Sequence, residues 1–383
     1  MLRILAIEPY YGGSHKAFLD GYRAHSRHQV ELLAMAPHKW KWRMRGAALH
    51  LAGLLEGREA DVILASDYLD LAALAGLRPW HLGHVPLAAY FHENQLTYPL
   101  PEGQERDYHY GFTNITTCLA ADRVIFNSRY HLDSFLEAAA GLLRRMPDCV
   151  PEGLAERIRE RSLVIPVGVD LEGIDSLRAE AAPRGGPLRI LWNHRWEFDK
   201  CPEAFFEAVG RLEEAGCQFE LAVVGQSFRT YPPAFDQARR RFAQRLRAFG
   251  YLEDRRDYLR LLLESDVVVS TAIHEFFGVA ILEAIYAGCM PLLPRRLSYP
   301  ELMPPHLHSA HLYRTPDELF DRLRRWAESP EEARSMDLRA AAAEFGWDRI
   351  APRLDAALEE LAEGEQPGAP PYGGALPRGG SDA

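Results

Sequence analysis

The sequence of 383 residues lacks several features that would restrict its class at once. It has no run of about 18 apolar residues, so no membrane-spanning helix is expected. The first residues, Met1 to Glu8, reach an acidic side chain too early for a secretory signal and predict a buried strand instead. The formal net charge is −10, which gives no general attraction to nucleic acid. An RNA partner would therefore have to meet a local basic patch.

Cysteine is scarce and shows no pairing pattern. The five cysteines are odd in number and include no Cys-x-x-Cys pair; they are Cys118, Cys149, Cys201, Cys217 and Cys289. This distribution is typical of a reducing cytosol and argues against a structural zinc site. We therefore expect a cytoplasmic protein. The sequence contains no internal repeat and indicates no oligomeric state.

Short apolar runs alternate with segments of helical periodicity along most of the chain. This alternation predicts βα units and parallel sheets. The expected strands form two series, near 2–7, 29–34, 61–65, 86–91, 123–126 and 162–166, and near 188–193, 217–225, 266–270, 289–293 and 310–313. Between the two series, the stretch 169–187 ends in Pro183-Arg184-Gly185-Gly186-Pro187 and is expected to be a linker.

The pattern therefore predicts an α/β protein with two doubly wound, Rossmann-like domains, 1–168 and 188–346, facing each other across a cleft. Ligands of such sheets bind beyond the carboxyl ends of the strands. A last helix is expected at about 347–362. The tail 363–383 is rich in proline and glycine and is expected to be disordered.

The most informative segment contains Glu275 and Glu283, eight positions apart, with Phe277-Gly278 between them. An expected buried strand precedes it, and an expected helix follows and ends near Gly288. A strand, a glycine turn and a helix N-terminus form an anion site, because unpaired backbone N–H groups face the ligand. Two flanking carboxylates suit a diphosphate with hydroxyls on both sides, as in a sugar nucleotide. The alternative is an amphipathic helix with two solvated glutamates.

A second glycine turn, Gly12-Gly13, directly follows the first expected strand. Two glycines allow the backbone to approach a ligand closely, and the helix that follows favours negative charge at its start. His15 is then in place to hydrogen-bond a phosphate or an acceptor. The alternative is an ordinary tight turn in which Ser14 caps the helix.

Arg195 and Lys200 stand five positions apart after the strand expected at 188–193. Two cations at the mouth of a strand can bind a diphosphate and stabilise it as a leaving group while its negative charge grows. The alternative is a surface pair without a role in chemistry.

His92, Glu93 and Asn94 follow the strand expected at 86–91, where sites collect in parallel sheets. Leu96 stands where the zinc-protease motif His-Glu-x-x-His has its second histidine, so that motif is excluded. A structural histidine is the alternative for His92. The histidines at 306, 308 and 311 are expected to be solvated loop residues rather than metal ligands.

Taken in order, these motifs resemble the retaining GT-B glycosyltransferases of family 4, over about residues 1–362. The resemblance implies that Arg195 and Lys200 receive the leaving diphosphate and that His92 lies beside the donor sugar. It also implies that Glu275 binds hydroxyls of that sugar and Glu283 the ribose. Donor binding further involves Gly12, Gly13, Phe277, Gly278 and Gly225.

Other positions fit or depart from this family. The segments 165–170 and 345–348 resemble its domain junction and its last helix, which returns to the first domain. His194 and Cys201 stand where it more often has glycine, so the backbone shape beside Arg195 and Lys200 departs from its pattern. No Asp-x-Asp occurs, and the two cations with two helix N-termini can replace a divalent ion under the diphosphate. We expect no metal and no cofactor.

The N-terminal half also resembles the tRNA-queuosine mannosyltransferases, in the segments Tyr10–Lys16, Lys39–Arg45 and Tyr90–Pro99. This resemblance implies transfer of mannose from GDP-mannose to the cyclopentenediol of queuosine at the wobble position of tRNA-Asp. The first domain would then bind the acceptor and the second the nucleotide sugar. The candidate acceptor-binding residues are His15, Lys39, Trp40, Lys41, Trp42, Glu93 and Asn94.

The alternating segment Lys39–Arg45 supports an RNA partner, because bases stack on indoles and cations bind phosphates. Its alternative is an amphipathic segment that packs two tryptophans. Another basic stretch, Arg239–Arg241 with Arg245 and Arg247, is expected to be a solvated helix. Two functional alternatives stay open: the same chemistry on a glycan, lipid or small-molecule acceptor, and a non-catalytic module that binds sugar nucleotides or RNA.

Overall fold

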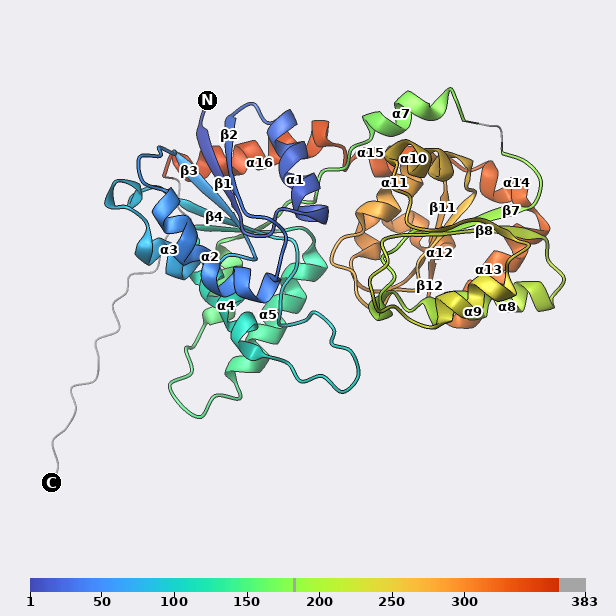
Figure 1. Cartoon of the computed structure of the whole chain (residues 1–383), viewed down its shortest axis with the longest axis horizontal. Helices are drawn as coiled ribbons and strands as arrows, with labels where there is room; N and C mark the ends of the chain where they lie inside the picture. The colour runs from blue at the N-terminus through green and yellow to red at the C-terminus, as the bar shows by residue number, and fades with distance from the viewer. Residues whose placement is uncertain (182–183, 365–383) are drawn as a thin grey trace.

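The computed structural model describes residues 1–181 and 184–364 and contains two parallel six-stranded sheets in separate halves of the molecule (Figure 1). The strands of the first sheet are β1 (Arg3–Glu8), β2 (Gln29–Ala34), β3 (Val62–Ser66), β4 (Leu87–Phe91), β5 (Arg123–Phe126) and β6 (Ser162–Val164). Those of the second are β7 (Leu188–Trp192), β8 (Phe219–Val224), β9 (Leu246–Gly250), β10 (Val267–Val269), β11 (Met290–Pro294) and β12 (Leu312–Tyr313). Strands β3, β4, β5 and β10 are buried along their whole length, because helices cover both faces of each sheet.

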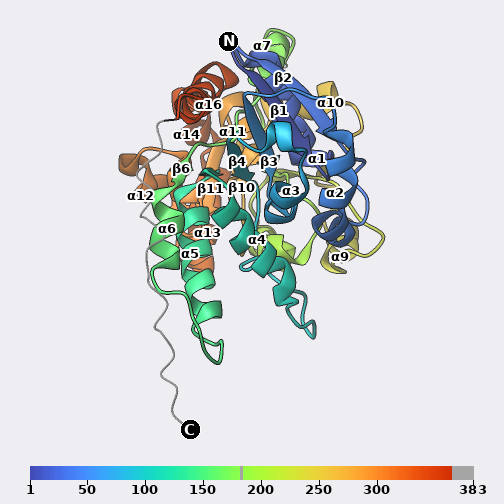
Figure 2. The same ribbon diagram turned by 90° about the vertical axis from the view of Figure 1, so that its left-hand side faces the viewer.

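The helices of the first half divide between two cores. Alternate residues of β1 point to opposite faces, so Ile4 and Ala6 join one core while Leu5 and Ile7 join the other. Helices α2 and α3 lie on the opposite side of the sheet from α16 (Figure 2). The helices are α1 (Gly13–His25), α2 (Trp40–Leu54), α3 (Leu71–Leu77), η1 (Trp80–Leu82), α4 (Tyr108–Ala120), α5 (Arg129–Leu143), α6 (Leu154–Glu160) and, from the end of the chain, α16 (Trp347–Ala362).

In the second half, α8, α9 and α13 lie on one face of the sheet and α10, α11 and α15 on the other (Figure 1). The bounds are η2 (Phe198–Lys200), α8 (Pro202–Glu214), α9 (Ala234–Arg241), α10 (Arg255–Glu264), α11 (Val279–Ala287), η3 (Tyr299–Leu302), η4 (Pro305–Leu307), α12 (His308–His311), α13 (Pro316–Glu328), α14 (Pro330–Arg334) and α15 (Arg339–Ala343).

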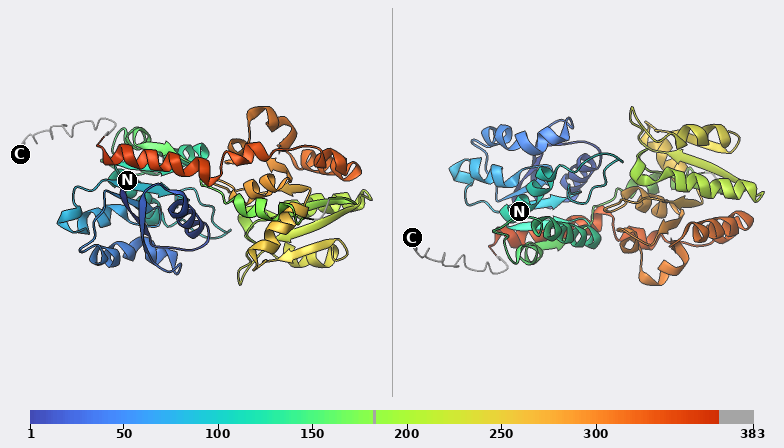
Figure 3. Two further views of the ribbon diagram at one scale, coloured as in Figure 1. Left: turned by 90° about the horizontal axis from the view of Figure 1, so that it is seen from above. Right: turned by 90° about the horizontal axis from the view of Figure 1, so that it is seen from below.

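Helix α16 returns from the second half to the first and packs against α1 (Figure 3). The Tyr22 hydroxyl donates to the Asp355 carboxylate at 2.7 Å, and Leu354, Leu358 and Leu361 are buried beneath the helix. Where the chain crosses between the halves, the N–H of Val169 donates to the carbonyl of Phe345 at 2.8 Å, which joins the outgoing and returning segments.

The order of the strands in each sheet indicates where a ligand would bind. The first sheet runs β2-β1-β3-β4-β5-β6 and the second β12-β11-β10-β7-β8-β9, so the winding direction reverses between β1 and β3 and between β7 and β10. Ligands of doubly wound sheets bind at these reversal points, because the loops there diverge and leave a crevice. Both reversal points carry predicted site motifs, after β1 and after β7 and β10.

Three expectations about local structure differ from the fold. Strand β9 was not predicted, and Arg247 lies on it rather than on a helix, because its neighbours Leu246 and Ala248 pair with β8. The expected linker 169–187 contains a helix, α7 (Glu172–Arg178), which packs on α10. His311, expected in solvent, is 1% exposed and bonds the Pro291 carbonyl at 3.1 Å.

Two expectations fall partly outside the described residues. These are the tail from residue 365 onward and positions 182–183 of the linker. Within the described residues, no helix is long and apolar enough to cross a membrane.

Candidate active site

Lys200 lies at the centre of the reversal point between β7 and β10. Its ammonium group is buried and donates to the His274 carbonyl at 2.8 Å. It also lies 3.3 Å from a Glu275 oxygen and 3.2 Å from an Asp199 oxygen. Burial opposes ionisation of Glu275, but Lys200 and the neighbouring histidines outweigh it and hold the pKa of that carboxyl below its usual value. Lys200 and Glu275, predicted from separate motifs, therefore meet as a charged pair.

The turn between Glu275 and α11 has the shape that the sequence predicted. Gly278 has φ of +113° at the N-cap of α11, a conformation that side-chain-bearing residues rarely adopt. The Ser298 hydroxyl donates to the carbonyls of Phe277 at 2.8 Å and Glu275 at 3.2 Å, so the turn is fixed from outside. Helix α11 then ends at Ala287 with Gly288 as its C-cap, as expected. Its free N-terminal amides are suited to an anion.

Arg195 joins the second half to the first. Its guanidinium donates to the Tyr98 hydroxyl at 3.1 Å and lies 3.1 Å from a Glu197 oxygen, yet its side chain stays 45% exposed. Tyr98 also packs its ring against His274, with centroids 4.7 Å apart. Arg195 is thus held in place without being covered, and it can still receive an anion.

A cavity of about 270 Å³ opens beside Arg195 between the ends of β7 and β8 and helices α10 and α11. Glu283 lines it and is paired with Arg255, while the Tyr258 hydroxyl donates to its other oxygen at 3.2 Å. Gly225 also lines it: a Cβ there would stand 1.8 Å from the His194 carbonyl oxygen, so only glycine fits. The cavity thus brings together Arg195, Gly225 and Glu283, all predicted to bind donor.

In the first half, the loops after β1, β3 and β4 meet around a buried histidine pair. His15 and His92 have ring centroids 4.2 Å apart, and the Nδ1 of His15 lies 3.0 Å from a Glu8 oxygen. Burial disfavours the charged imidazole, but Glu8 outweighs it and raises the pKa of His15 to about 9. His92 has no such partner, so burial and the charge of His15 lower its pKa well below the usual value. One imidazole is charged and its neighbour neutral.

Asp67 completes this cluster beneath the histidines. Its carboxyl accepts the backbone N–H of His92 at 2.8 Å, and burial raises its pKa to about 8. The Ser66 hydroxyl donates to Glu8 at 3.0 Å. These groups lie at the first reversal point, and their bonds fix the position of the histidines there.

The glycines after β1 differ from each other. Gly12 is the N-cap of α1 in place of Ser14, and a Cβ on it would stand 2.6 Å from Pro37. Glycine is therefore required at position 12 by packing against Pro37, whether or not a ligand binds there. Gly13 has φ of +54° and faces open space, where a ligand can approach.

The candidate acceptor-binding residues Asn94 and Glu93 differ in burial and in hydrogen bonding. Asn94 is fully buried and bonds Leu96 and Thr97 within its own turn, so its side chain shapes the turn and is not presented to an acceptor. Glu93 is partly buried and accepts from the Tyr68 hydroxyl at 2.7 Å and from Gln95 at 2.9 Å.

The segment from Lys39 to Trp42 forms the start of α2. Lys39 has φ of +53°, and Trp40 packs against Tyr110 and Tyr68 with centroids 5.2 and 6.1 Å away. Lys41 lies over the Trp40 ring at 5.6 Å, while Trp42 is 63% exposed. The ring of Trp42 lies over Gly46 of the same helix but stays largely in solvent, so the two tryptophans are not both packed inside as the amphipathic alternative requires.

Several residues of this site were missed by sequence reasoning. Glu8, Arg255 and Tyr258 each contact a predicted residue but lie outside the motifs, and Tyr98 lies inside the segment Tyr90–Pro99 but was given no role. Only Glu8 gave a signal, as a carboxylate ending a buried strand at a reversal point. Among residues 1–181 and 184–364, no group of three or more His, Cys, Asp or Glu side chains is arranged to hold a metal ion.

Family models match both halves of the chain. Residues 3–169 match the N-terminal region of tRNA-queuosine alpha-mannosyltransferases, and residues 174–343 match the glycosyl transferases of group 1. A tRNA-queuosine alpha-mannosyltransferase from Drosophila melanogaster is 38% identical over 335 residues, which cover 85% of this chain and 87% of that protein. A GDP-mannose-dependent alpha-(1-6)-phosphatidylinositol dimannoside mannosyltransferase from Mycobacterium tuberculosis is 26% identical over 206 residues, 52% of this chain and 53% of that protein.

Solved structures share the fold at low identity. Sucrose-phosphate synthase from Thermosynechococcus elongatus aligns with a TM-score of 0.68 and 15% identity, covering 94% of this chain and 99% of that one. HepE of Anabaena, in complex with UDP-glucose, aligns with a TM-score of 0.64 and 18% identity, covering 94% of this chain and all of that one. Fold and site thus define a glycosyltransferase of the GT-B class. Within that class, the chain belongs to the tRNA-queuosine alpha-mannosyltransferase family.

Proposed function

We propose that the protein transfers mannose from GDP-mannose to the cyclopentenediol of queuosine at the wobble position of tRNA-Asp, with retention of anomeric configuration. The observation that carries this proposal is the similarity to the Drosophila enzyme over 85% of the chain, which includes both halves of the site. The mycobacterial relative, whose name specifies GDP-mannose, supports the choice of donor.

The donor would lie in the second half, across the cavity beside α11. Glu283 would accept the ribose hydroxyls, since each of its oxygens has one protein partner and can accept another bond. Glu275 would bind hydroxyls of the mannose. Arg195, Lys200 and the amides near Phe277 and Gly278 would bind the diphosphate.

The chemical step needs no side-chain nucleophile. The acceptor hydroxyl attacks the anomeric carbon on the face from which the diphosphate leaves; the new C–O bond forms as the old one breaks, and the departing phosphate oxygen takes the proton. Charge grows on the diphosphate in this transition state, so cations fixed beforehand at that position lower the barrier. Lys200, already bonded to His274 and Glu275, needs little reorganisation to act.

The acceptor would meet the first half. The neutral imidazole of His92 would face the reacting carbon, with His15 and Glu93 beside the cyclopentenediol. Trp42 is exposed enough to stack on a base, and Lys39 and Lys41 have no carboxylate partner among the described residues. The five cysteines are all free, which supports a reducing, cytoplasmic location.

The test is transfer of radiolabelled mannose from GDP-mannose to queuosine-containing tRNA, beside the same tRNA without queuosine. Label on the first alone is expected. Label on neither, with slow release of mannose from GDP-mannose, would leave the donor in place and refute the acceptor. No reaction with GDP-mannose but transfer from UDP-glucose would refute the donor.

A further inference from the structure

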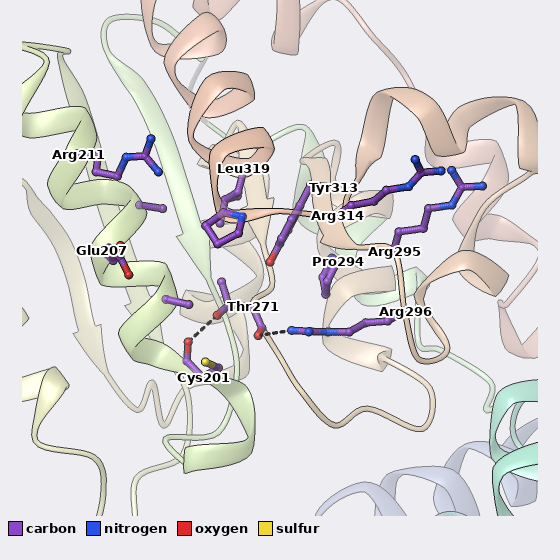
Figure 4. A pocket seen from close by; sticks show the side chains of 13 residues that line it. Cys201, Glu207, Arg211, Thr271, Pro294, Arg295, Arg296, Tyr313, Arg314 and Leu319 are labelled. Atoms are coloured by element: carbon purple, nitrogen blue, oxygen red, sulfur yellow. Dashed lines mark hydrogen bonds between the residues drawn. The ribbon is translucent and has the colours of Figure 1, made fainter. Parts of the chain in front are cut away.

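A second cavity, of about 220 Å³, lies on the other face of the second sheet, between α8, the end of β11 and the start of α13 (Figure 4). Arginines dominate its polar lining. Four of them, Arg211, Arg295, Arg296 and Arg314, face a single lining carboxylate, Glu207. In a chain whose net charge is −10, this is a local excess of positive charge.

Two of these arginines are held by the protein. Arg211 pairs with Asp317 at 2.9 Å. The guanidinium of Arg296 donates to the backbone carbonyls of Ala272 at 3.2 Å and Thr271 at 3.3 Å. These carbonyls position Arg296 but carry no net charge, so its positive charge stays uncompensated.

Arg295 and Arg314 are exposed, and neither guanidinium has an ion pair or hydrogen bond within the described part of the chain. Figure 4 shows the two side chains extending next to each other at the rim of the cavity. Many other arginines in this half pair with carboxylates, as Arg241 does with Glu213. Two like charges side by side repel, and an anion between them would remove that cost.

The turn that presents Arg295 is strained. Leu297 has φ of +60°, a left-handed conformation that is unfavourable for a residue of this type. Such strain persists only where the surrounding structure imposes it, and it gathers at binding sites.

The cavity adjoins the active site. Thr271 and Cys201 line it, and the Thr271 hydroxyl donates to the Lys200 carbonyl at 3.0 Å. Further along the same loop, Glu301 accepts the backbone N–H groups of Arg129 and Tyr130 at 2.8 and 2.7 Å, across the junction of the two halves. The segment that carries Arg295 and Arg296 thus runs from this cavity to the contact of Glu301 with the first half.

We propose that Arg295 and Arg314, backed by Arg296, bind backbone phosphates of the RNA acceptor. This inference rests on the proposed function and adds to it a contact from the donor-binding half. Guanidinium groups match phosphate oxygens with paired hydrogen bonds, and such contacts position RNA without reading its sequence. An acceptor held by both halves would favour the closed arrangement in which transfer takes place.

The test compares two double variants of the full chain with the wild type, by fluorescence anisotropy of queuosine-containing tRNA over a range of salt concentrations. Arg295→Glu with Arg314→Glu is expected to weaken binding at least tenfold at low salt. It should also reduce the slope of log Kd against log salt by about one to two, because up to two phosphate contacts are lost. The matched control, Arg240→Glu with Arg324→Glu, makes the same change in net charge at exposed helix positions outside the cavity.

Equal effects of the two pairs would overturn the phosphate site. So would an unchanged slope in Arg295→Ala with Arg314→Ala, a milder pair that avoids introducing negative charge. Inhibition by pyrophosphate that the first pair abolishes, while RNA binding stays as in the wild type, would assign the arginines to a small anion instead. If wild-type protein transferred mannose to queuosine-containing tRNA but both pairs bound alike, only this inference would fail. If the wild type neither bound nor modified that tRNA, the proposed function would fail with it.

Discussion

Lys200 is buried beside two carboxylates, Glu275 and Asp199, so its charge serves both the fold and the proposed chemistry. The carboxylates hold the ammonium at the mouth of β7, where a diphosphate would lie at the N-terminus of α11. Because the ammonium is fixed before the reaction, its contribution should appear in the transition state more than in donor binding.

Lys200→Ala is therefore expected to lower kcat by a factor of about 10² to 10³ while the fold persists. Steady-state kinetics with a thermal-unfolding check would measure both. Lys16→Ala, which removes an exposed lysine paired with Asp20, is the control and should leave kcat unchanged. Turnover near the wild-type rate in the Lys200 variant would contradict the assignment of this residue to the leaving group.

A second prediction concerns the charged His15. Its pKa is about 9 in the folded protein, above the value near 6.5 of an unperturbed histidine. The stability that this shift contributes is complete below pH 6.5 and is lost as the pH rises through 9, and it amounts to at most about 3 kcal/mol. Asp67 acts in the same direction, since its raised pKa of about 8 means that ionisation at higher pH is unfavourable in the fold.

The free energy of unfolding in urea should therefore fall between pH 6.5 and pH 9. Glu8→Gln removes the main attraction on His15 and should flatten this decline. His50→Gln, an exposed position, should not. A wild-type stability that is constant or rising over this interval would show that His15 is not held in its charged form.

Many of the site residues could be predicted from the sequence. Contacts between residues of different halves could not. Arg195, Lys200, Glu275 and Gly225 follow strands whose carboxyl ends meet, so their order along the chain was enough to bring them together. Tyr98 contacts Arg195 from 97 positions away, and such a contact depends on how the two halves dock.

At the scale of elements, the same contrast holds. The buried strands were recognisable as apolar runs bounded by turns. Strand β9 was not, because it is an edge strand whose residues are only half-buried, and the exposed Arg247 interrupts its apolar run. Helix α7 was hidden in a segment rich in proline and glycine at its far end.

The N-terminus of α5, in the first half, contacts residues of the second half. Glu301 accepts its first two free amides, the Ser128 hydroxyl donates to the Phe276 carbonyl at 2.6 Å, and His131 stacks on Phe276 with centroids 4.0 Å apart. A carboxylate at a helix N-terminus stabilises by about 0.3–1 kcal/mol. This modest contribution would bias the closed arrangement without locking it.

Glu301→Gln is expected to lower kcat by up to about fivefold, as that free energy implies, and to increase the radius of gyration measured by small-angle X-ray scattering. Glu328→Gln, at an exposed surface pair with Arg324, is the control. If both kcat and the radius of gyration were unchanged in the Glu301 variant, the bridge would have no part in closure.

At the scale of the whole molecule, the positive charges that would bind the donor diphosphate are supplied by protein groups. Arg195, Lys200 and the N-terminus of α11 face the position proposed for the diphosphate, and no Asp-x-Asp pair is present in the sequence. Mannose transfer should therefore proceed undiminished in EDTA. The rate would be measured with and without added Mg²⁺ or Mn²⁺, and a strict need for either ion would contradict metal-free catalysis.

The crossing of α16 back to the first half has a consequence for modularity. A fragment ending before residue 188 would lack the helix whose Leu354, Leu358 and Leu361 are buried in the first half, and the face of α1 around Tyr22 would be open to water. The unit that folds is therefore discontinuous in the gene. Recombination that exchanges everything beyond the linker between relatives would pair the first half with a foreign last helix, so viable chimaeras should need three matched segments rather than two.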